Sequence, residues 1–384
     1  MSRSFGRHLI LILAGAGFLA LAGSVAGAAQ GAPAPAGTQA PDDFQQLVQA
    51  AQAEGVLAVI GLTRSKANYG VIFDTFSELY GIKVVLLDPA ATSSDQVDAI
   101  RYGLDGQGSP ADAPDVVEVG LAYAPDLKAG GLAAPYKVRT WNSIPDAFKD
   151  PDGYWFGGYY GSLVLEVNTS QVQDPLSDWG DLLKPGFQGM LALTGDPAHG
   201  HPAGLTAVAA AGQAASGSLA DAWSGLAFFL RLDEAGSLVA ALGSWRSLDF
   251  GVNSVQAWWD FNAMLNQELN GPATATVIPA SGQVACVFAQ GISACAPHPN
   301  AARLYEEFLF SDEGQLLWLQ GHAHPARLDD LVQRQVVSGQ LLDCLPAVPA
   351  GTVTCFPTPD ELMTVREVCE EQWEKVVGVH IPYR

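Results

Sequence analysis

The chain is poor in basic residues and lacks the motifs of several common enzyme classes. Its 384 residues include 19 Lys and Arg against 40 Asp and Glu, which gives a formal net charge of −21. This acidic excess disfavours nucleic acid and anionic membrane surfaces as partners. The sequences Gly-x-Ser-x-Gly, Ser-x-x-Lys, His-Glu-x-x-His and Gly-x-x-x-x-Gly-Lys are all missing. Their absence lowers the odds of an enzyme without excluding one.

The first 28 residues have the pattern of an export signal. Arg3 and Arg7 precede an apolar run at 9–21, and Ala26-Gly27-Ala28 supplies the small residues of a signal-peptidase site. We expect secretion by the general route, cleavage after Ala28 and a protein free in the periplasm. The arginines are not adjacent, and no cysteine near the site would carry a lipid anchor. Residues 29–42, rich in Ala, Pro and Gly, predict a flexible tether.

Residues 43–158 alternate between strand and helix patterns. Short apolar runs at 56–60, 82–87 and 115–119 are typical of buried parallel strands, and helical spacing of apolar residues follows each. Right-handed crossovers place the loops after these strands at one sheet edge, where α/β proteins bind ligands. Arg64, Ser65 and Tyr123 in these loops are therefore candidate ligand contacts.

An aromatic segment spaced by glycines, 155–161, opens the next region. It runs into the alternating residues 163–167, which predict a strand. A short helix at 178–183, a strand at 190–194 and a helix at 203–215 follow. Aromatic rings on a glycine-rich segment that crosses between two halves of the protein suit a ligand clamp better than a catalytic centre. Tyr160 in this crossing, and Asp196 in the loop after the second strand, join the candidate contacts.

Four segments resemble those of a known family. They are Asp178-Trp179-Gly180-Asp181-Leu182, Gly186-Phe187-Gln188-Gly189, Gly195-Asp196-Pro197 and Ala296-Pro297-His298-Pro299-Asn300-Ala301-Ala302. Their order is similar to that in bacterial extracellular solute-binding proteins. The group most resembled is the type II periplasmic binding proteins of ABC importers, which handle polyamines, thiamine, ferric iron and aminophosphonates. The resemblance covers nearly all of the chain after about residue 43.

The resemblance implies an α/β fold of two lobes, each a mostly parallel sheet flanked by helices, joined by two hinge crossings. Lobe 1 would comprise 43–158 and 285–384, and lobe 2 would comprise 159–284. The sequence without the resemblance would equally support three consecutive α/β pieces. The implied role is that of a monomer without a cofactor, which delivers a small ligand to an ABC transporter permease in the inner membrane.

Residues 258–262, Trp-Trp-Asp-Phe-Asn, contain the best ligand candidates. The resemblance to the family implies that these residues lie where polyamine-type relatives have a tryptophan that lines the cleft. A tryptophan face beside a carboxylate suits a cation, so Trp258 and Asp260 favour an organic cation such as a polyamine or thiamine. The alternative is that Trp259 belongs to the core and Asp260 caps or pairs locally. Arg64 points instead to a carboxylate or phosphate on the ligand.

Two His-x-His pairs, His199/His201 and His322/His324, are not predicted to bind metal because neither has a nearby cysteine to complete a site. His199 and His201 precede a helix N-terminus, where they are either solvated loop residues or ligand contacts, and His199 is kept as a candidate contact. We interpret His322 and His324 as structural.

Ferric iron is disfavoured by the position of the tyrosines. Ferric-binding relatives use a tyrosine pair inside lobe 2, but Tyr159 and Tyr160 lie at the first crossing. Residues 255–260, where the resemblance would place the pair, contain no tyrosine.

The five cysteines suit an oxidising compartment without forming a disulfide scaffold. Cys344 and Cys355 flank a proline-containing loop and are the favoured pair. Cys369 lies on the apolar face of a predicted helix and should be buried and reduced. Cys286 and Cys295 would pair across a hairpin at Gln290-Gly291, or lie apart on one continuous strand. The continuous strand, which the resemblance implies, is preferred.

The favoured function is solute binding for import, with an organic cation as the ligand. A ferric iron or aminophosphonate binding protein of the same fold is the alternative. A periplasmic hydrolase that uses cleft carboxylates such as Asp196 and Asp260 is a third hypothesis.

Overall fold

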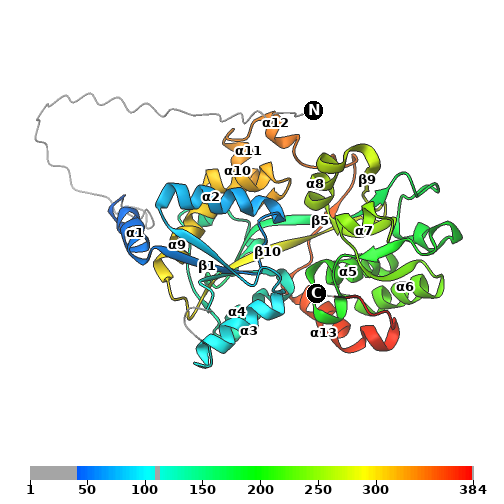
Figure 1. Ribbon diagram of the computed structural model, residues 1–384, viewed down its shortest axis with the longest axis horizontal. Coiled ribbons are helices and arrows are strands. Elements are labelled where there is room, and N and C mark those ends of the chain that lie inside the picture. Colours follow the sequence, from blue (N-terminus) through cyan, green and yellow to red (C-terminus); the bar gives the residue numbers. More distant parts are fainter. Residues whose placement is uncertain (1–40, 109–112, 383–384) are drawn as a thin grey trace, which may run out of the picture. The chain divides into compact units, whose positions relative to one another are not determined.

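A mixed β-sheet of twelve strands runs through the protein (Figure 1). The structure is a computed structural model that describes residues 41–108 and 113–382. Eight principal strands lie in the order β2-β1-β3-β10-β5-β8-β6-β7. The predicted signal segment 1–28 and the tether up to residue 40 lie outside the described residues.

The first three strands form the parallel unit predicted from the sequence. β1 (Val56–Ile60) pairs in parallel with β2 (Lys83–Leu87) and with β3 (Val116–Gly120). The helices of this region are α1 (Pro41–Glu54), α2 (Tyr69–Tyr80), α3 (Ser93–Leu104) and α4 (Ala124–Ala129). β3 is buried along its whole length, as expected of a parallel strand covered on both faces.

Two long strands connect this unit to the rest of the sheet. β10 (Gln283–Ser293) runs antiparallel to β3 and to the first part of β5 (Phe156–Asn168). The later part of β5 pairs with β8 (Val255–Trp259) and β9 (Thr274–Val277). The strand predicted at 163–167 therefore begins at Phe156, and the aromatic segment belongs to it. β10 passes through Gln290 and Gly291 without turning, so the continuous strand is confirmed and the hairpin is wrong.

A β-bulge interrupts the pairing of β5 with β10. The register shifts between Phe288 and Ala289 of β10, which leaves Gly158 of β5 without a partner across the ladder. The Gly158 carbonyl accepts a hydrogen bond from Ala326 N at 3.0 Å. A Cβ on Gly158 would lie 2.6 Å from the Trp318 ring, so the close packing there requires glycine.

The second group of strands continues from β8. β6 (Leu191–Leu193) pairs in parallel with β8 and with β7 (Leu238–Leu242). The helices of this region are α5 (Pro202–Ser216), α6 (Ala222–Glu234), α7 (Trp245–Asp249) and α8 (Asp260–Asn270). Asp221 and Ser244 cap α6 and α7 through hydrogen bonds to backbone N–H groups, which fixes where these helices begin.

The C-terminal region is mainly helical. It contains α9 (Pro299–Leu309), α10 (Asp312–Gln320), α11 (Leu328–Gln333), α12 (Gly339–Leu342) and α13 (Pro359–Val376).

Short elements occur along the whole described chain. The two-residue strands are β4 (Ala133–Ala134), β11 (His324–Pro325) and β12 (Thr354–Cys355). The 3₁₀ helices are η1 (Lys66–Asn68), η3 (Leu121–Tyr123), η4 (Trp141–Ser143), η5 (Asp146–Phe148), η6 (Trp179–Leu183), η7 (Pro185–Phe187), η8 (Pro197–His199) and η9 (Gly271–Ala273).

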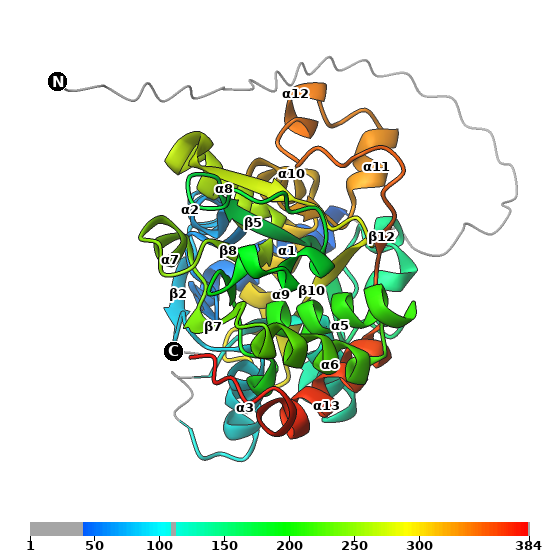
Figure 2. The same cartoon turned by 90° about the vertical axis from the view of Figure 1, so that its right-hand side faces the viewer.

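Helix α13 packs against elements from both groups of strands. It contacts η3 after β3, and it also lies beside α5 and α6 (Figure 2). The Trp373 and Phe229 rings are 5.4 Å apart. Cys369 is buried with a free thiol, as predicted. Residues from 40 onward group as one compact unit, and the lobe boundaries 43–158 with 285–384 and 159–284 stay a prediction.

Candidate functional site: a cavity at the strand ends

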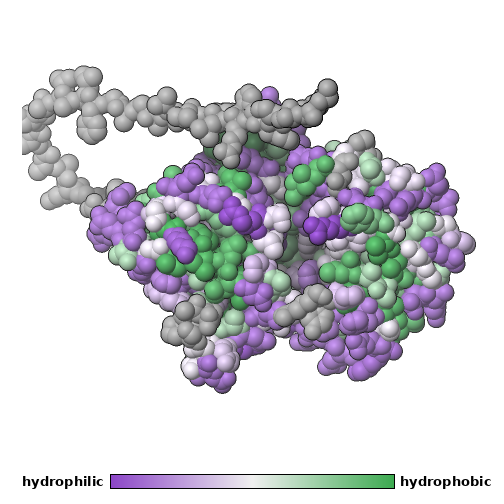
Figure 3. All heavy atoms as spheres, viewed as in Figure 1, coloured by the Kyte–Doolittle hydropathy of each residue, from purple (hydrophilic) through white to green (hydrophobic). Residues whose placement is uncertain are grey.

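A cavity of about 570 Å³ lies at the carboxyl ends of the parallel strands. The loops after β1 and β2 and the end of β3 line one side. The other side comes from the loop after β6, the start of α5, and parts of α7, β8 and α8. The lining residues are Gly61, Thr63, Ser65, Lys66, Pro89, Ala90, Ala91, Thr92, Ser93, Gln96, Glu118, Gly120, Thr194, His201, Pro202, Trp245, Trp258, Trp259, Asn262, Leu265, Asn266, Leu269 and Phe288. The face drawn in Figure 3 is hollowed near its middle.

Lys66 brings a positive charge to the cavity. Its Nζ lies 2.7 Å from Glu118 Oε1 and 4.6 Å from the centre of the Phe288 ring. The Lys66 side chain keeps 27% of its surface exposed, so its ammonium group is partly accessible. A ligand in the cavity can therefore meet this cation.

An unfavourable backbone turn presents Lys66. Ala67 and Asn68 have φ angles of 43° and 66°, in the left-handed region that residues with a Cβ rarely adopt. Asn68 Nδ2 donates a hydrogen bond to the Leu317 carbonyl at 2.7 Å. This contact ties the turn to α10 and holds the conformation in place.

Glu118 is the buried acceptor at the centre of a polar cluster. Besides Lys66 it accepts hydrogen bonds from Tyr159 Oη at 3.0 Å, from Gln290 Nε2 at 2.8 Å and from Tyr69 Oη. Burial raises the pKa of Tyr69 and of Tyr159 well above the usual value, and the charge of Glu118 acts in the same direction. Both phenols therefore stay protonated and donate. With four donors already bound, this carboxylate has little capacity left for a ligand.

His201 caps α5 beside the cavity. Its Nδ1 accepts a hydrogen bond from Ala203 N at 3.3 Å, which leaves the proton of the neutral ring on Nε2. Burial lowers the pKa of His201 to about 4, and the charge of Lys66 acts in the same direction. A Cβ on Gly195 would lie 1.9 Å from the ring, so the glycine makes room for it. Neutral His201 and the N-terminus of α5 together provide hydrogen-bond donors and partial positive charge.

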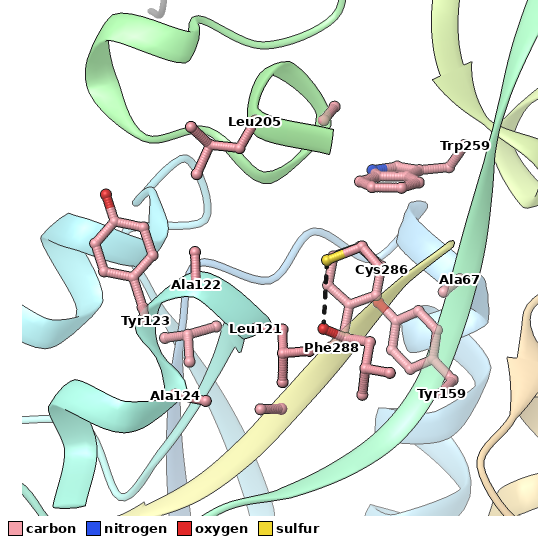
Figure 4. Close-up of a cluster of buried hydrophobic side chains, with 14 of the residues drawn as sticks. Ala67, Leu121, Ala122, Tyr123, Ala124, Tyr159, Leu205, Trp259, Cys286 and Phe288 are labelled. Carbon is pink, nitrogen blue, oxygen red and sulfur yellow. Dashed lines mark hydrogen bonds between the residues drawn. The ribbon is translucent and has the colours of Figure 1, made fainter. Parts of the chain in front are cut away.

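Tryptophans line the side formed by the second group of strands. Trp258 and Trp259 end β8, and Trp245, which is 46% exposed, begins α7. The Trp259 ring lies 5.4 Å from the Phe288 ring in an edge-to-face arrangement, beside Cys286 and Tyr159 (Figure 4). These rings offer flat apolar faces to a ligand.

A buried carboxyl group supports α8 from behind. Glu166 of β5 accepts hydrogen bonds from Gln256 Nε2 at 2.7 Å and from Asn266 Nδ2 at 2.5 Å. Burial raises the pKa of Glu166 to about 7, so the group titrates near neutral pH. Asn266 lines the cavity and thus links this buried acid to the site.

Of the predicted contacts, Ser65 and Trp258 line the cavity. Arg64, the neighbour of Ser65, instead forms an exposed ion pair with Asp74 at 2.6 Å. Tyr123 is buried, and its hydroxyl donates to Glu370 Oε1 of α13 at 3.2 Å. The Arg64 and Tyr123 side chains therefore pair with other residues and do not line the cavity.

The remaining predicted contacts support neighbouring structure. Asp196 is buried and accepts a hydrogen bond from Ala198 N at 2.9 Å, and its Oδ2 lies 2.6 Å from His199 Nδ1, so both side chains are occupied. Tyr160 stacks on His324, with ring centres 4.6 Å apart.

Asp260 is fully buried at the start of α8 and does not line the cavity. It accepts from Ser162 N at 3.0 Å and from Phe261 N at 2.8 Å. Asp260 is therefore occupied within the protein, with one neighbouring partner, Phe261, and with Ser162, which is distant in the sequence.

The predicted Cys344–Cys355 disulfide is not formed, and all five cysteines are free. The two residues are held by different elements. Cys355 lies in β12, which pairs with β10, whereas the Cys344 carbonyl follows α12 and accepts from His322 Nδ1 at 2.7 Å. Within the described residues, no group of three or more His, Cys, Asp and Glu side chains could hold a metal ion.

Most of the lining residues were not identified from the sequence, and Lys66, Glu118 and Asn266 are among them. Glu118 did carry a usable signal, because it is the one charged residue in the apolar run 116–120. Lys66 and Asn266 had none, since each lies in a polar stretch where a solvated side chain is the ordinary outcome.

Comparisons with known proteins agree with this architecture. The sequence profile of the family described as bacterial extracellular solute-binding protein matches residues 112–345. The periplasmic binding protein AfuA of Actinobacillus pleuropneumoniae, solved with exogenous fructose-6-phosphate bound, superposes with a TM-score of 0.65 at 19% identity, over 85% of this chain and 99% of that chain. The ferric binding protein of Campylobacter jejuni gives 0.63 at 17% identity, over 83% and 99%.

A further relative is similar over a shorter region. Iron uptake protein A1 of Synechocystis sp. (strain ATCC 27184 / PCC 6803 / Kazusa) is 28% identical over 130 residues. This match covers 32% of the present chain and 34% of that relative, so the chain spans about a third of its length.

The chain has the α/β fold of the type II periplasmic binding proteins, as predicted. The chain belongs to the bacterial extracellular solute-binding protein family. The family is defined by binding of solutes, in agreement with the prediction that the chain is not an enzyme. Within residues 41–108 and 113–382, every helix is too short or too polar to cross a membrane.

Proposed function

We propose that the protein is the periplasmic solute-binding component of an ABC importer. In this role it closes over a small ligand and presents it, as a monomer, to a permease in the inner membrane. Family membership and the cavity at the strand ends support the proposal. Closure of such a protein needs dihedral changes in only a few residues of the connecting strands, here β5 and β10.

The ligand we propose is a small organic molecule with one anionic group, such as a phosphate ester or carboxylate, and a flat or apolar part. The observation that carries this proposal is the balance of charge in the cavity. Lys66 and His201 line it beside the partial positive charge of the start of α5, while Glu118 is already bound to four donors. The anionic group would lie against Lys66 and the start of α5, with the remainder against Trp258 and Trp259.

An organic cation of the polyamine or thiamine kind is the second candidate. Trp258 in the cavity favours it, because a tryptophan face attracts cations. The cation would have to displace Lys66 from Glu118, since Asp260 is buried and bound elsewhere. Ferric iron is less well supported, because the described lining contains neither tyrosine nor aspartate.

Thermal denaturation of the mature protein with a ligand panel tests the proposal. The panel is fructose 6-phosphate, 2-aminoethylphosphonate, spermidine, thiamine and ferric citrate. A true ligand at 100 times its dissociation constant stabilises the folded state by about 2.7 kcal/mol. An anionic ligand should lose this effect in Lys66→Met and keep it in Lys83→Met, an exposed lysine of β2 outside the cavity.

The other outcomes separate the alternatives. Stabilisation by spermidine or thiamine that survives Lys66→Met would replace the anionic ligand with the cationic one. No stabilisation by any compound, together with no small molecule in mass spectra of the freshly purified protein, would count against solute binding itself.

A further inference from the structure

Two histidines of one short segment reach opposite ends of helix α8. His324 Nε2 lies 2.8 Å from Asp260 Oδ2, and Asp260 is the first residue of α8. His322 Nε2 lies 3.3 Å from Glu268 Oε2, in the last turn of the same helix. The His-x-His pair thus contacts α8 at both ends, although 54 residues separate Glu268 from His322.

The backbone holds both histidines in place. His322 has a φ of 64°, and the following Ala323 donates its N–H to the Trp318 carbonyl at 3.1 Å, which closes the turn after α10. His324 belongs to β11, where it pairs with Tyr160 of β5, and the two rings also stack. Both histidines are buried, so their rings have little freedom to choose other partners.

The partners of His322 make it sensitive to protonation. Its Nδ1 faces the Cys344 carbonyl at 2.7 Å, and a carbonyl can only accept, so Nδ1 carries a proton. Its Nε2 faces the Glu268 carboxylate, which also accepts when ionised. The doubly protonated imidazolium keeps the hydrogen bond to Cys344 and forms an ion pair with Glu268. The neutral ring keeps the bond to Cys344 but has no charge to pair with Glu268.

The ionisable groups that face this pair are acids, a thiol and a phenol. Asp260 contacts His324, and Asp329 acts on Tyr160, the ring stacked on His324. Glu268 contacts His322, and both Glu268 and Asp343 act on the thiol of Cys344. Carboxylates thus surround the pair.

Helix α8 forms part of the cavity, which it lines through Asn262, Leu265, Asn266 and Leu269. We infer that His322 and His324 are positioning residues that hold this wall in place, and that protonation of His322 strengthens the hold. The expected consequence is tighter ligand binding as pH falls, and this consequence rests on the proposed function. The attachment of α8 is a separate property that needs no ligand.

Hydrogen–deuterium exchange of residues 260–270 in the ligand-free mature protein tests the attachment. After correction for the intrinsic effect of pH, we expect exchange to be about threefold or more slower at pH 5.5 than at pH 8.0, relative to α5. Glu268→Gln and His322→Asn should reduce this difference, and what remains reports Glu166, which also holds α8 through Asn266. Asparagine tolerates the positive φ at 322, and Glu268 is 63% exposed, so both variants should fold. His380→Asn, at an exposed histidine, should retain the difference.

The inference is overturned if exchange of 260–270 in the wild type does not change with pH, or if the change is as large in His322→Asn as in the wild type. Affinity for fructose 6-phosphate gives the second readout: the ratio of the affinity at pH 5.5 to that at pH 8.0 should be larger in the wild type than in His322→Asn. The titration of the phosphate and of Glu166 is common to both proteins and cancels in this comparison. If no panel compound binds while α8 behaves as expected, the proposed function fails and the attachment stands.

Discussion

Lys66 Nζ lies 2.7 Å from Glu118 Oε1, a contact that joins the turn after β1 to the buried strand β3. Removing either partner should destabilise the protein. We expect Glu118→Gln to lower the free energy of unfolding by about 2–4 kcal/mol, because Tyr69, Tyr159 and Gln290 also lose a charged acceptor. Urea denaturation of Glu118→Gln, Lys66→Met and the double variant measures this loss and the coupling between the pair. A coupling energy of about 1–2 kcal/mol is expected, and strictly additive effects would contradict a direct interaction.

Glu166 should make stability depend on pH. Its pKa is raised to about 7 in the folded protein, so the native state holds this proton after the unfolded chain has released it. Below about pH 4.5 both states are protonated and the effect is absent. As pH rises to 7, the unfolding free energy should fall by about 3 kcal/mol relative to that of Glu166→Gln, and then level off. Denaturation of both proteins from pH 4.5 to 8 gives this difference. The exposed substitution Glu234→Gln serves as the control, and a difference that stays flat would show that Glu166 does not titrate in this range.

Ala67→Gly should stabilise the protein although it removes a buried methyl group. Ala67 has a φ of 43°, which glycine adopts without the penalty that a Cβ carries. We expect the free energy of unfolding to rise by about 0.5–1 kcal/mol. The matched substitution Ala53→Gly, at an exposed position of α1, should lower it by about 1 kcal/mol. If both substitutions destabilise equally, the turn at Ala67 carries no conformational strain.

Gly195→Ala should disturb the cavity directly. The added Cβ would lie 1.9 Å from His201 Nδ1, so the ring must leave its position at the start of α5. We expect a loss of about 1–3 kcal/mol in the free energy of unfolding, and weaker binding of any anionic compound that stabilises the wild type. Gly180→Ala, where an added Cβ meets no atom within 4 Å, should behave as the wild type in both measurements. Wild-type affinity in Gly195→Ala would argue against a role of His201 in the site.

Local patterns predicted the elements better than the side chains of the site. The run 56–60 is apolar and the run 115–119 contains three valines, and both are flanked by turn and capping residues, so strands could be identified without knowledge of their partners. Which side chain faces the cavity depends on backbone geometry a few residues away. The left-handed turn at Ala67 and Asn68 follows Lys66, which pairs with Glu118, while Arg64 pairs with Asp74 at the surface. Residues 64–68 include no glycine, so the usual signal of a turn with positive φ angles is missing from this segment.

Long-range pairing was also beyond the sequence. Asp260 was a reasonable ligand contact by composition, but its partners Ser162 and His324 lie about a hundred and about sixty residues away. Nothing in the local pattern reveals that a carboxylate is already occupied by such partners. The same holds for His322, because its contact with Glu268 depends on how the turn after α10 is placed against α8.

The bulge at Gly158 lets β5 carry one more residue than the facing part of β10 while its tyrosines keep their sides of the sheet. Successive residues of a strand face opposite sides, and a bulge absorbs one additional residue locally. Phe156 pairs with Gln290 and Tyr159 pairs with Phe288, so the residues before and after Gly158 both stay in register with β10. Tyr159 therefore donates to Glu118, and Tyr160 lies against His324. One residue inserted after Tyr160, where the pairing is continuous, should instead turn the later side chains of β5 to the opposite side of the sheet.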